Sequence, residues 1–87
     1  MRKLYAGVLK RFFHSHLIHV RYDRRLTQAQ MARLLGMAVR SYVALDHGKT
    51  CCSGLTLARF LIYCCEDPSA FLADLRAAFE QEASLDA

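Results

Sequence analysis

The chain has 87 residues, enough for a single domain with a hydrophobic core, which is expected to span residues 1–87. Its hydrophobic content of 54% argues against disorder. One Pro and four Gly leave little room for turn-rich β architecture, and no run of 18 apolar residues offers a membrane span. The net charge of +4 is uneven: residues 1–49 carry +8 and residues 50–87 carry −4, so the first half favours a polyanion, nucleic acid before an anionic membrane.

The first predicted element is a helix over much of residues 3–23. Apolar side chains recur there at helical spacing, at Leu4, Val8, Phe12, Phe13, Leu17 and Val20. Gly7 is the position at which this helix could break. Lys10 and Arg11 interrupt the apolar start before a secretory signal could form, so a cytoplasmic protein is expected.

Two short helices are predicted next. Thr27 can cap the first of them, and Gln30 stands three residues later, as a capping box requires. Gly36 follows this helix, where a left-handed residue often ends a helix. A second helix is expected over residues 39–47, before Gly48. The side chains expected on the inner faces of this pair are Met31, Ala32, Leu35, Tyr42 and Leu45.

Two further helices complete the expected fold. Ser53 can cap a helix that reaches Cys64, and Asp67-Pro68 is a start signal for a last helix over residues 68–83. Core spacing is found at Leu57, Phe60, Leu61 and Cys64. The last helix presents one apolar face that is expected either in the core or in a dimer interface, formed by Phe71, Leu72, Leu75 and Phe79. The sequence therefore predicts an all-α, compact bundle of five to six helices.

The stretch between residues 26 and 48 has the features of a helix-turn-helix. Two short helices meet across a turn of three to four residues that begins with Gly36, and the small Ala32 permits their close approach. The outer face of the second helix can then enter the major groove of DNA, which is wide enough for one α-helix.

Three stretches carry a resemblance to a known family: LTQAQMARLLGM, LDHGKT and LARFLIYCCEDP. With them the chain resembles the lambda-repressor-like, XRE-type helix-turn-helix family over about residues 17–68. The resemblance does not include the N-terminal helical extension, residues 1–16, or the last helix, residues 68–83. The resemblance implies a bundle of about five helices, sequence-specific binding of double-stranded DNA by homodimers, most often to repress transcription, and no cofactor.

The resemblance also implies which positions contact DNA: Arg21, Gln28, Val39, Arg40, Ser41, Val43, Ala44, Lys49 and Thr50. Gln28 would contact phosphate at the start of its helix. Arg40 is the best candidate for bidentate contact to a guanine edge. Arg21 would touch phosphate and pair with an acid at the end of the reading helix, and Asp46 supplies that acid.

Some residues depart from the family pattern. Ala38 stands in place of a Ser or Thr cap, and Tyr42 is larger than the usual Val or Ile. Arg25 replaces the Gly that commonly closes the first helix, and Cys51-Cys52 stands where some relatives are basic. The reading face is therefore poor in polar groups, and specificity would be modest or depend on DNA shape.

Other functions stay open. A protein-interaction module of the same fold, antitoxin-like or regulator-binding, would need little DNA affinity, and the last helix could bind a protein partner. A membrane-surface protein could use the basic, aromatic segment Lys3–Phe13. His47 near Cys51-Cys52 would permit a metal or redox site, although none is expected, and reduced thiols are the default. Because the sequence contains no recognisable set of catalytic residues, we do not expect an enzyme.

Overall fold

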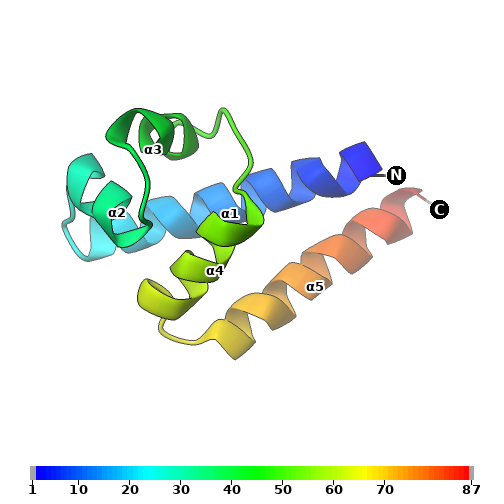
Figure 1. Cartoon of the computed structure of the whole chain (residues 1–87). Coiled ribbons are helices and arrows are strands. Elements are labelled where there is room, and N and C mark those ends of the chain that lie inside the picture. Colours follow the sequence, from blue (N-terminus) through cyan, green and yellow to red (C-terminus); the bar gives the residue numbers. More distant parts are fainter. Residues whose placement is uncertain (1, 87) are drawn as a thin grey trace.

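The computed structural model describes residues 2–86, with side chains described for residues 4–84. Over that range the chain is all α-helical, as predicted, with no strand. The helices, in chain order, are α1 (Arg2–Asp23), α2 (Gln28–Leu34), α3 (Val39–Asp46), α4 (Gly54–Tyr63) and α5 (Pro68–Asp86). The first and last helices, α1 and α5, are long, and the three between them in the sequence are short. Figure 1 shows their arrangement.

Helix α1 is continuous, so the break considered at Gly7 is absent. Tertiary contacts offset the weak helix propensity of glycine: Val8 is buried, and the ring of Tyr5 lies 5.0 Å from that of Phe79 in α5. The helix ends in a Schellman motif, in which Leu26 N–H donates to the carbonyl of Arg21 at 2.9 Å. The left-handed position of this motif is Arg25, with φ of 56°.

Replacing Arg25 by glycine is expected to raise the free energy of unfolding by about 0.5–1 kcal/mol. An L-residue with a Cβ atom is strained in the left-handed region by about 1–2 kcal/mol, and part of that gain is offset by the freedom of glycine in the unfolded chain. Chemical denaturation followed by circular dichroism measures the change. Arg25→Ala is the matched control, because it removes the charge but keeps Cβ. An equal gain in both variants would attribute the effect to charge instead.

The caps predicted for α2 are present. The Thr27 hydroxyl accepts from Gln30 N–H at 3.1 Å, and the Gln30 side chain accepts from Thr27 N–H at 2.8 Å. Gly36 has φ of 66°, and Met37 N–H closes the helix end on the Ala32 carbonyl. A Cβ atom on Gly36 would come within 2.8 Å of Nε of Arg59. The Arg59 side chain connects α4 to α2, because its Nη2 donates to the Leu34 carbonyl at 3.1 Å. The left-handed backbone therefore favours glycine here, and a Cβ atom would in addition displace the Arg59 side chain.

The remaining helices differ from the prediction mainly at their ends. Helix α3 ends at Asp46, one residue early, and Gly48 takes φ of 71° after it. Ser53 and Asp67 accept from the N–H groups of Thr56 and Ala70, both at 3.1 Å. Helix α5 continues to Asp86 instead of ending at residue 83.

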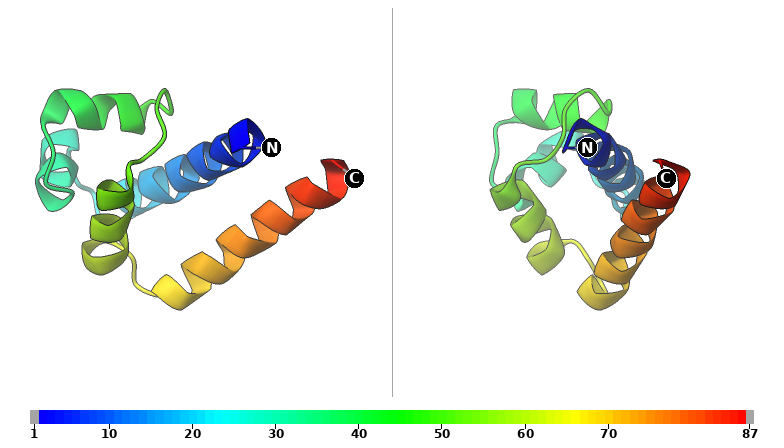
Figure 2. Two further views of the ribbon diagram at one scale, coloured as in Figure 1. Left: turned by 45° about the vertical axis from the view of Figure 1, so that its right-hand side comes forward. Right: turned by 90° about the vertical axis from the view of Figure 1, so that its right-hand side faces the viewer.

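One core cluster joins all five helices. Its buried members are Phe13, Leu17, Met31, Ala32, Leu35, Tyr42, Leu45, Phe60, Cys64 and Phe71. Phe60 of α4 lies centrally, with its ring 5.1 Å from that of Phe13 and 5.6 Å from that of Phe71. The apolar face predicted for α5 is divided: Phe71 and Leu75 pack in the core, whereas Leu72 is 50% exposed. Figure 2 shows α1 and α5 directed so that both chain ends lie on the same side.

Candidate nucleic-acid interface

Helix α3 lies at the surface, between α2 and the loop that leads to α4 (Figure 1). Its N-cap residue, Ala38, has extended backbone and makes no side-chain capping bond, as the sequence led us to expect. A helix of this length is marginal by itself, so contacts elsewhere must hold it. Tyr42 and Leu45 pack in the core, and the polar contacts of α3 with other helices gather at its C-terminal end.

The carboxylate of Asp46, in the last turn of α3, joins three helices. Arg21 of α1 donates from Nε to Oδ1 at 2.8 Å and from Nη2 to Oδ2 at 3.3 Å. Gln28 of α2 donates to Oδ2 at 3.1 Å, and the hydroxyl of Tyr42 donates to Oδ1 at 2.9 Å. We call these four residues the Asp46 cluster. The pairing of Arg21 with Asp46 that the resemblance implied is present.

The Asp46 cluster is an ion pair with neutral donors around it. Burial alone would raise the pKa of Asp46, but hydrogen bonds from Gln28, Tyr42 and Arg21, with the charge of Arg21, lower it below its usual value. Burial opposes the charge of Arg21 as well, yet the Asp46 carboxylate raises the pKa of that guanidinium. Burial and the bond to Asp46 raise the pKa of Tyr42, which therefore stays a donor.

Helix α1 holds α3 at a second point. The ring of His14 donates from Nε2 to the backbone carbonyl of Asp46 at 2.9 Å, and Nε2 must carry the proton because a carbonyl only accepts. The same ring lies against Gly48, where a Cβ atom would come within 3.4 Å of three ring atoms. The end of α3 is thus fixed to α1 through both side chain and backbone.

The outward positions of α3 are divided between exposed and half-buried side chains. Val39, Arg40 and Ser41 in its first turn are exposed, and Val39 has 47% of its surface free. Val43 and Ala44 are half-buried. The exposed part of this face therefore presents one cation, one hydroxyl and one apolar side chain.

Four predicted positions share one shallow recess beside α3. Arg40, Ser41, Ala44 and Thr50 line it together with Cys51, and its volume is about 440 Å³. Lys49 is exposed in the loop that follows α3. The loop and the outward side of α3 thus form one surface, which we call the α3 face; it consists of Val39, Arg40, Ser41, Val43, Ala44, Lys49 and Thr50.

Arg21 and Gln28 do not belong to the α3 face in the same way. Both donate to Asp46, and the Arg21 side chain is only 14% exposed and also donates to the Leu26 carbonyl at 3.2 Å. Two of the five N–H groups of Arg21 are left for another partner. These two residues therefore hold α3 in place, and any phosphate contact from them is additional to that role.

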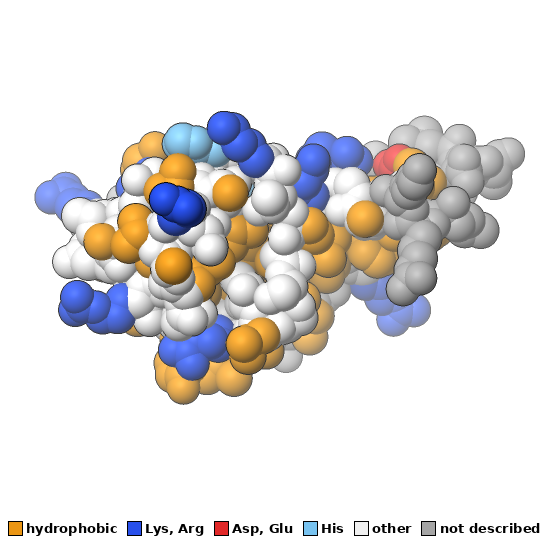
Figure 3. Space-filling view, turned by 45° about the horizontal axis from the view of Figure 1, so that its top comes forward, with side chains coloured by type: hydrophobic (Ala, Val, Ile, Leu, Met, Phe, Trp, Pro, Cys, Tyr) orange, Lys and Arg blue, Asp and Glu red, His pale blue; other side chains and the backbone are white. Residues whose placement is uncertain are grey.

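The charge distribution on this side of the molecule is one-sided. Figure 3 views the molecule from the side of α3, and Lys and Arg side chains lie over and around that region. Among the coloured atoms, acidic side chains are confined to the far end of the view. The side that carries the α3 face is accordingly suited to a polyanion.

Sequence reasoning missed two residues of the site. The size of Tyr42 was noted, but not that its hydroxyl would be buried against Asp46, four residues later on the same helix. That i,i+4 spacing was a usable signal. His14 carried no such signal, because its partner is a backbone carbonyl 32 residues away.

The alternatives gain little from the geometry. A membrane-surface role would need free aromatic side chains in the segment Lys3–Phe13. The ring of Tyr5 instead packs on Phe79 of α5, and the ring of Phe12 packs on Phe71. No helix in the described part of the chain is long and apolar enough to cross a membrane.

The four cysteines are free thiols, and burial raises the pKa of Cys52 to about 12, so that thiol is poorly reactive. Residues 2–86 contain no group of three potential metal ligands.

Comparison with known proteins adds no relative. No protein-family model matches the chain, and neither a curated protein nor a solved structure does.

Proposed function

We propose that this protein is a sequence-specific DNA-binding transcriptional regulator, with α2 and α3 as a helix-turn-helix and the α3 face as its reading surface. The observation that carries the proposal is the combination of an exposed α3 face with a rigid attachment of α3 through the Asp46 cluster. A helix that reads base edges must be presented outward and held in one orientation. The exposure of Val39, Arg40 and Ser41 supports the first condition, and the bonds from Arg21 and Gln28 to Asp46 support the second.

Roles on the α3 face follow from side-chain chemistry. Arg40 is the base-reading donor, because its guanidinium can bond O6 and N7 of a guanine together. Val39 and Ala44 contact thymine methyl groups, and Ser41 and Val43 complete the reading turn. Lys49 and Thr50 contact phosphate, supplemented by Gln28 and the free N–H groups of Arg21.

The proposed regulator acts as a homodimer and as a repressor, on two half-sites about one helical turn apart. The exposed side of α5, where Leu72 has half of its surface free, is the candidate surface for the second copy. Two reading helices would then give the affinity that one short, largely apolar face lacks.

The rival function is a protein-interaction module that uses the same face without DNA. The low polar content of the α3 face favours it, since Val39 is exposed there beside the half-buried Val43 and Ala44. The experiment must therefore separate binding of a polyanion from binding of a specific sequence.

Fluorescence-anisotropy titration of a random duplex pool, at low and at physiological salt and followed by selection of bound duplexes, makes that separation. A steep salt slope with an enriched, two-fold symmetric sequence is expected, because each neutralised phosphate contributes about 0.9 to the slope. A steep slope without enrichment would mean non-specific binding. Absence of binding even at low salt would contradict the proposal and favour the rival.

Arg40→Ala is expected to weaken binding to the selected sequence about 10- to 100-fold and to leave non-specific binding nearly unchanged. Lys49→Ala should instead weaken both and reduce the salt slope by about 1. The matched control is Arg76→Ala, which removes an exposed arginine of α5 that pairs with Glu80. If Arg76→Ala has the same effect as Arg40→Ala, the loss reflects net charge and not the α3 face.

A further inference from the structure

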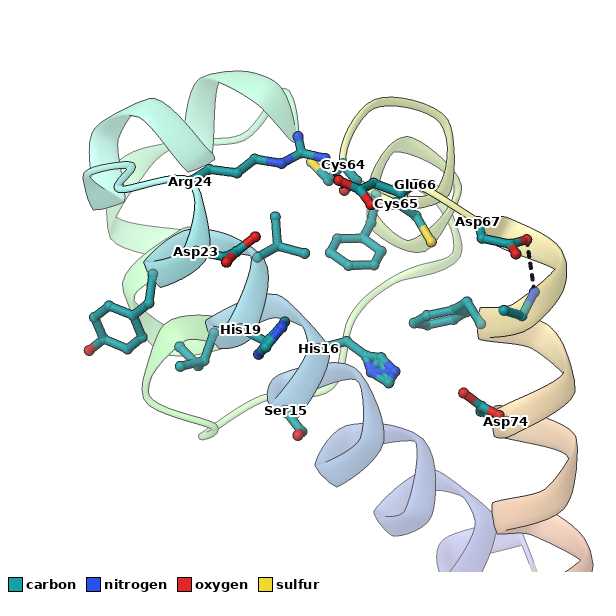
Figure 4. Close-up of a pocket in the computed structure, with 16 residues that line it drawn as sticks. Ser15, His16, His19, Asp23, Arg24, Cys64, Cys65, Glu66, Asp67 and Asp74 are labelled. Atoms are coloured by element: carbon teal, nitrogen blue, oxygen red, sulfur yellow. Dashed lines mark hydrogen bonds between the residues drawn. The ribbon is translucent and has the colours of Figure 1, made fainter.

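A second surface lies on the other side of α1. A groove of about 980 Å³ runs between the C-terminal half of α1 and the corner where α4 passes into α5. Figure 4 shows its lining, with His16, His19 and Asp23 coming from α1 and Glu66, Asp67 and Asp74 from the corner and α5. Nothing in the proposed DNA binding uses this groove.

The floor of the groove is apolar. The buried rings of Phe60 and Phe71 line it, and the half-buried Val20 of α1 packs against the same core. Tyr22 lies at its edge and is 65% exposed. Tyrosine is among the residue types that contribute most binding energy when a partner covers them. The groove can therefore bury apolar side chains of a partner.

The rim of the groove is acidic. It carries four exposed carboxylates, at Asp23, Glu66, Asp67 and Asp74, against a single arginine, Arg24. None of these carboxylates is in an ion pair among the described side chains. Arg24 is engaged, because it donates to the Cys64 carbonyl at 2.8 Å. The protein as a whole has a net charge of +4, but this rim is locally negative. It therefore attracts positively charged groups.

His16 does not cancel this charge. His16 stacks on Phe12, with ring centroids 4.3 Å apart, and meets Phe71 edge-on at 5.0 Å. Burial lowers the pKa of His16, against the opposing effect of Asp74, so that ring is mostly neutral at pH 7. The groove thus combines an apolar floor with a negative rim at physiological pH.

The groove and the α3 face lie on opposite sides of α1. His14 and Arg21, which reach α3, are seven residues apart and share one side of the helix. His16 and Asp23 of the groove each follow two residues later, a rotation of about 200°. A molecule in the groove would therefore leave α3 free.

We propose that the groove binds a short amphipathic segment of a partner protein, with apolar side chains flanked by Lys or Arg, and that it does so while the α3 face is occupied. Charge complementarity selects this occupant: the rim repels an acidic segment, and a basic one can pair with carboxylates on both sides of an apolar floor. A basic segment is also kept from the α3 side, where the surface charge is positive.

The test is a titration of a fluorescein-labelled peptide of leucine and lysine, about 14 residues in four helical turns. The titrated variant replaces three rim carboxylates, Asp23→Asn with Glu66→Gln and Asp74→Asn, and is expected to weaken binding at least about tenfold. The matched control, Glu80→Gln with Glu82→Gln, removes acidic side chains of α5 outside the groove and should change binding less than about twofold. Retained DNA binding and circular dichroism show that each variant is folded.

A second variant tests the floor without removing a carboxylate. Ala70 is exposed and lines the groove, so Ala70→Arg adds bulk and positive charge there and should abolish peptide binding. Amide chemical shifts should move at groove residues such as Ile18, Val20 and Cys65 and not on the α3 face. The proposal fails if the peptide does not bind, if both carboxylate variants weaken binding equally, or if a peptide with Glu in place of Lys binds as well. It also fails if the groove variants abolish self-association, since a second copy would then be the occupant.

Discussion

Replacing Asp46 by alanine is expected to lower the free energy of unfolding by about 3–5 kcal/mol at pH 7. Its carboxylate, 6% exposed, accepts from three side chains on three helices. The substitution would leave the Arg21 charge and the Tyr42 hydroxyl without a partner in a largely buried place, and the loss of one member of such a pair has this magnitude. Chemical denaturation measures it, and a small domain has only about 5–15 kcal/mol in total.

The pH dependence of this effect identifies its cause. Because the pKa of Asp46 is lower in the folded chain than in the unfolded chain, where it is about 3.9, the carboxylate stabilises the fold above about pH 4. That contribution disappears as the pH falls through the lower folded-state pKa, so the difference between the parent chain and the variant should shrink in acid. Glu80→Ala is the control: its exposed pair with Arg76 should contribute less than about 1 kcal/mol. A difference that is constant down to pH 2 would contradict the electrostatic explanation.

Phe60→Ala is expected to cost a further large amount, about 3–5 kcal/mol. Phe60 is 1% exposed, and its ring contacts Phe13 of α1 and Phe71 of α5, so its removal leaves a cavity where three helices meet. The same denaturation experiment measures the loss, and Phe60→Leu should recover part of it because more of the volume is kept.

The control for this variant lies two residues away on the same helix. Ile62 is 69% exposed, so Ile62→Ala should change the free energy of unfolding by no more than about 0.5 kcal/mol. Comparable losses from both substitutions would show that helix propensity in α4, and not the packing of Phe60, determines the stability.

Local signals in the sequence predicted where α2, α4 and α5 begin and where α2 ends. The capping residues Thr27, Ser53 and Asp67 and the left-handed Gly36 act on backbone groups within a few residues, so their roles can be read without knowing the fold. The possible break at Gly7 was the wrong expectation, because contacts with a helix more than 60 residues later decide that point. Propensity is weaker than such packing.

The site was predictable only in part. The pairing of Arg21 with Asp46 came from a family resemblance, not from spacing, since 25 residues separate them. The acidic groove could not be foreseen at all. Its lining comes from α1, α4 and α5, and the contact of Arg24 with the Cys64 carbonyl that closes one side spans 40 residues. Surfaces assembled from distant segments leave no periodic trace in a sequence.

The arrangement of the two chain ends has a practical consequence. Residues near both ends meet where the rings of Tyr5 and Phe79 lie 5.0 Å apart, and the ends point away from α3 (Figure 1). A fluorophore or an affinity tag fused at either end would therefore sit remote from the α3 face. Donor and acceptor dyes placed at the two ends would start close together, so separation of α1 from α5 could be followed as a fall in energy transfer while DNA is being titrated.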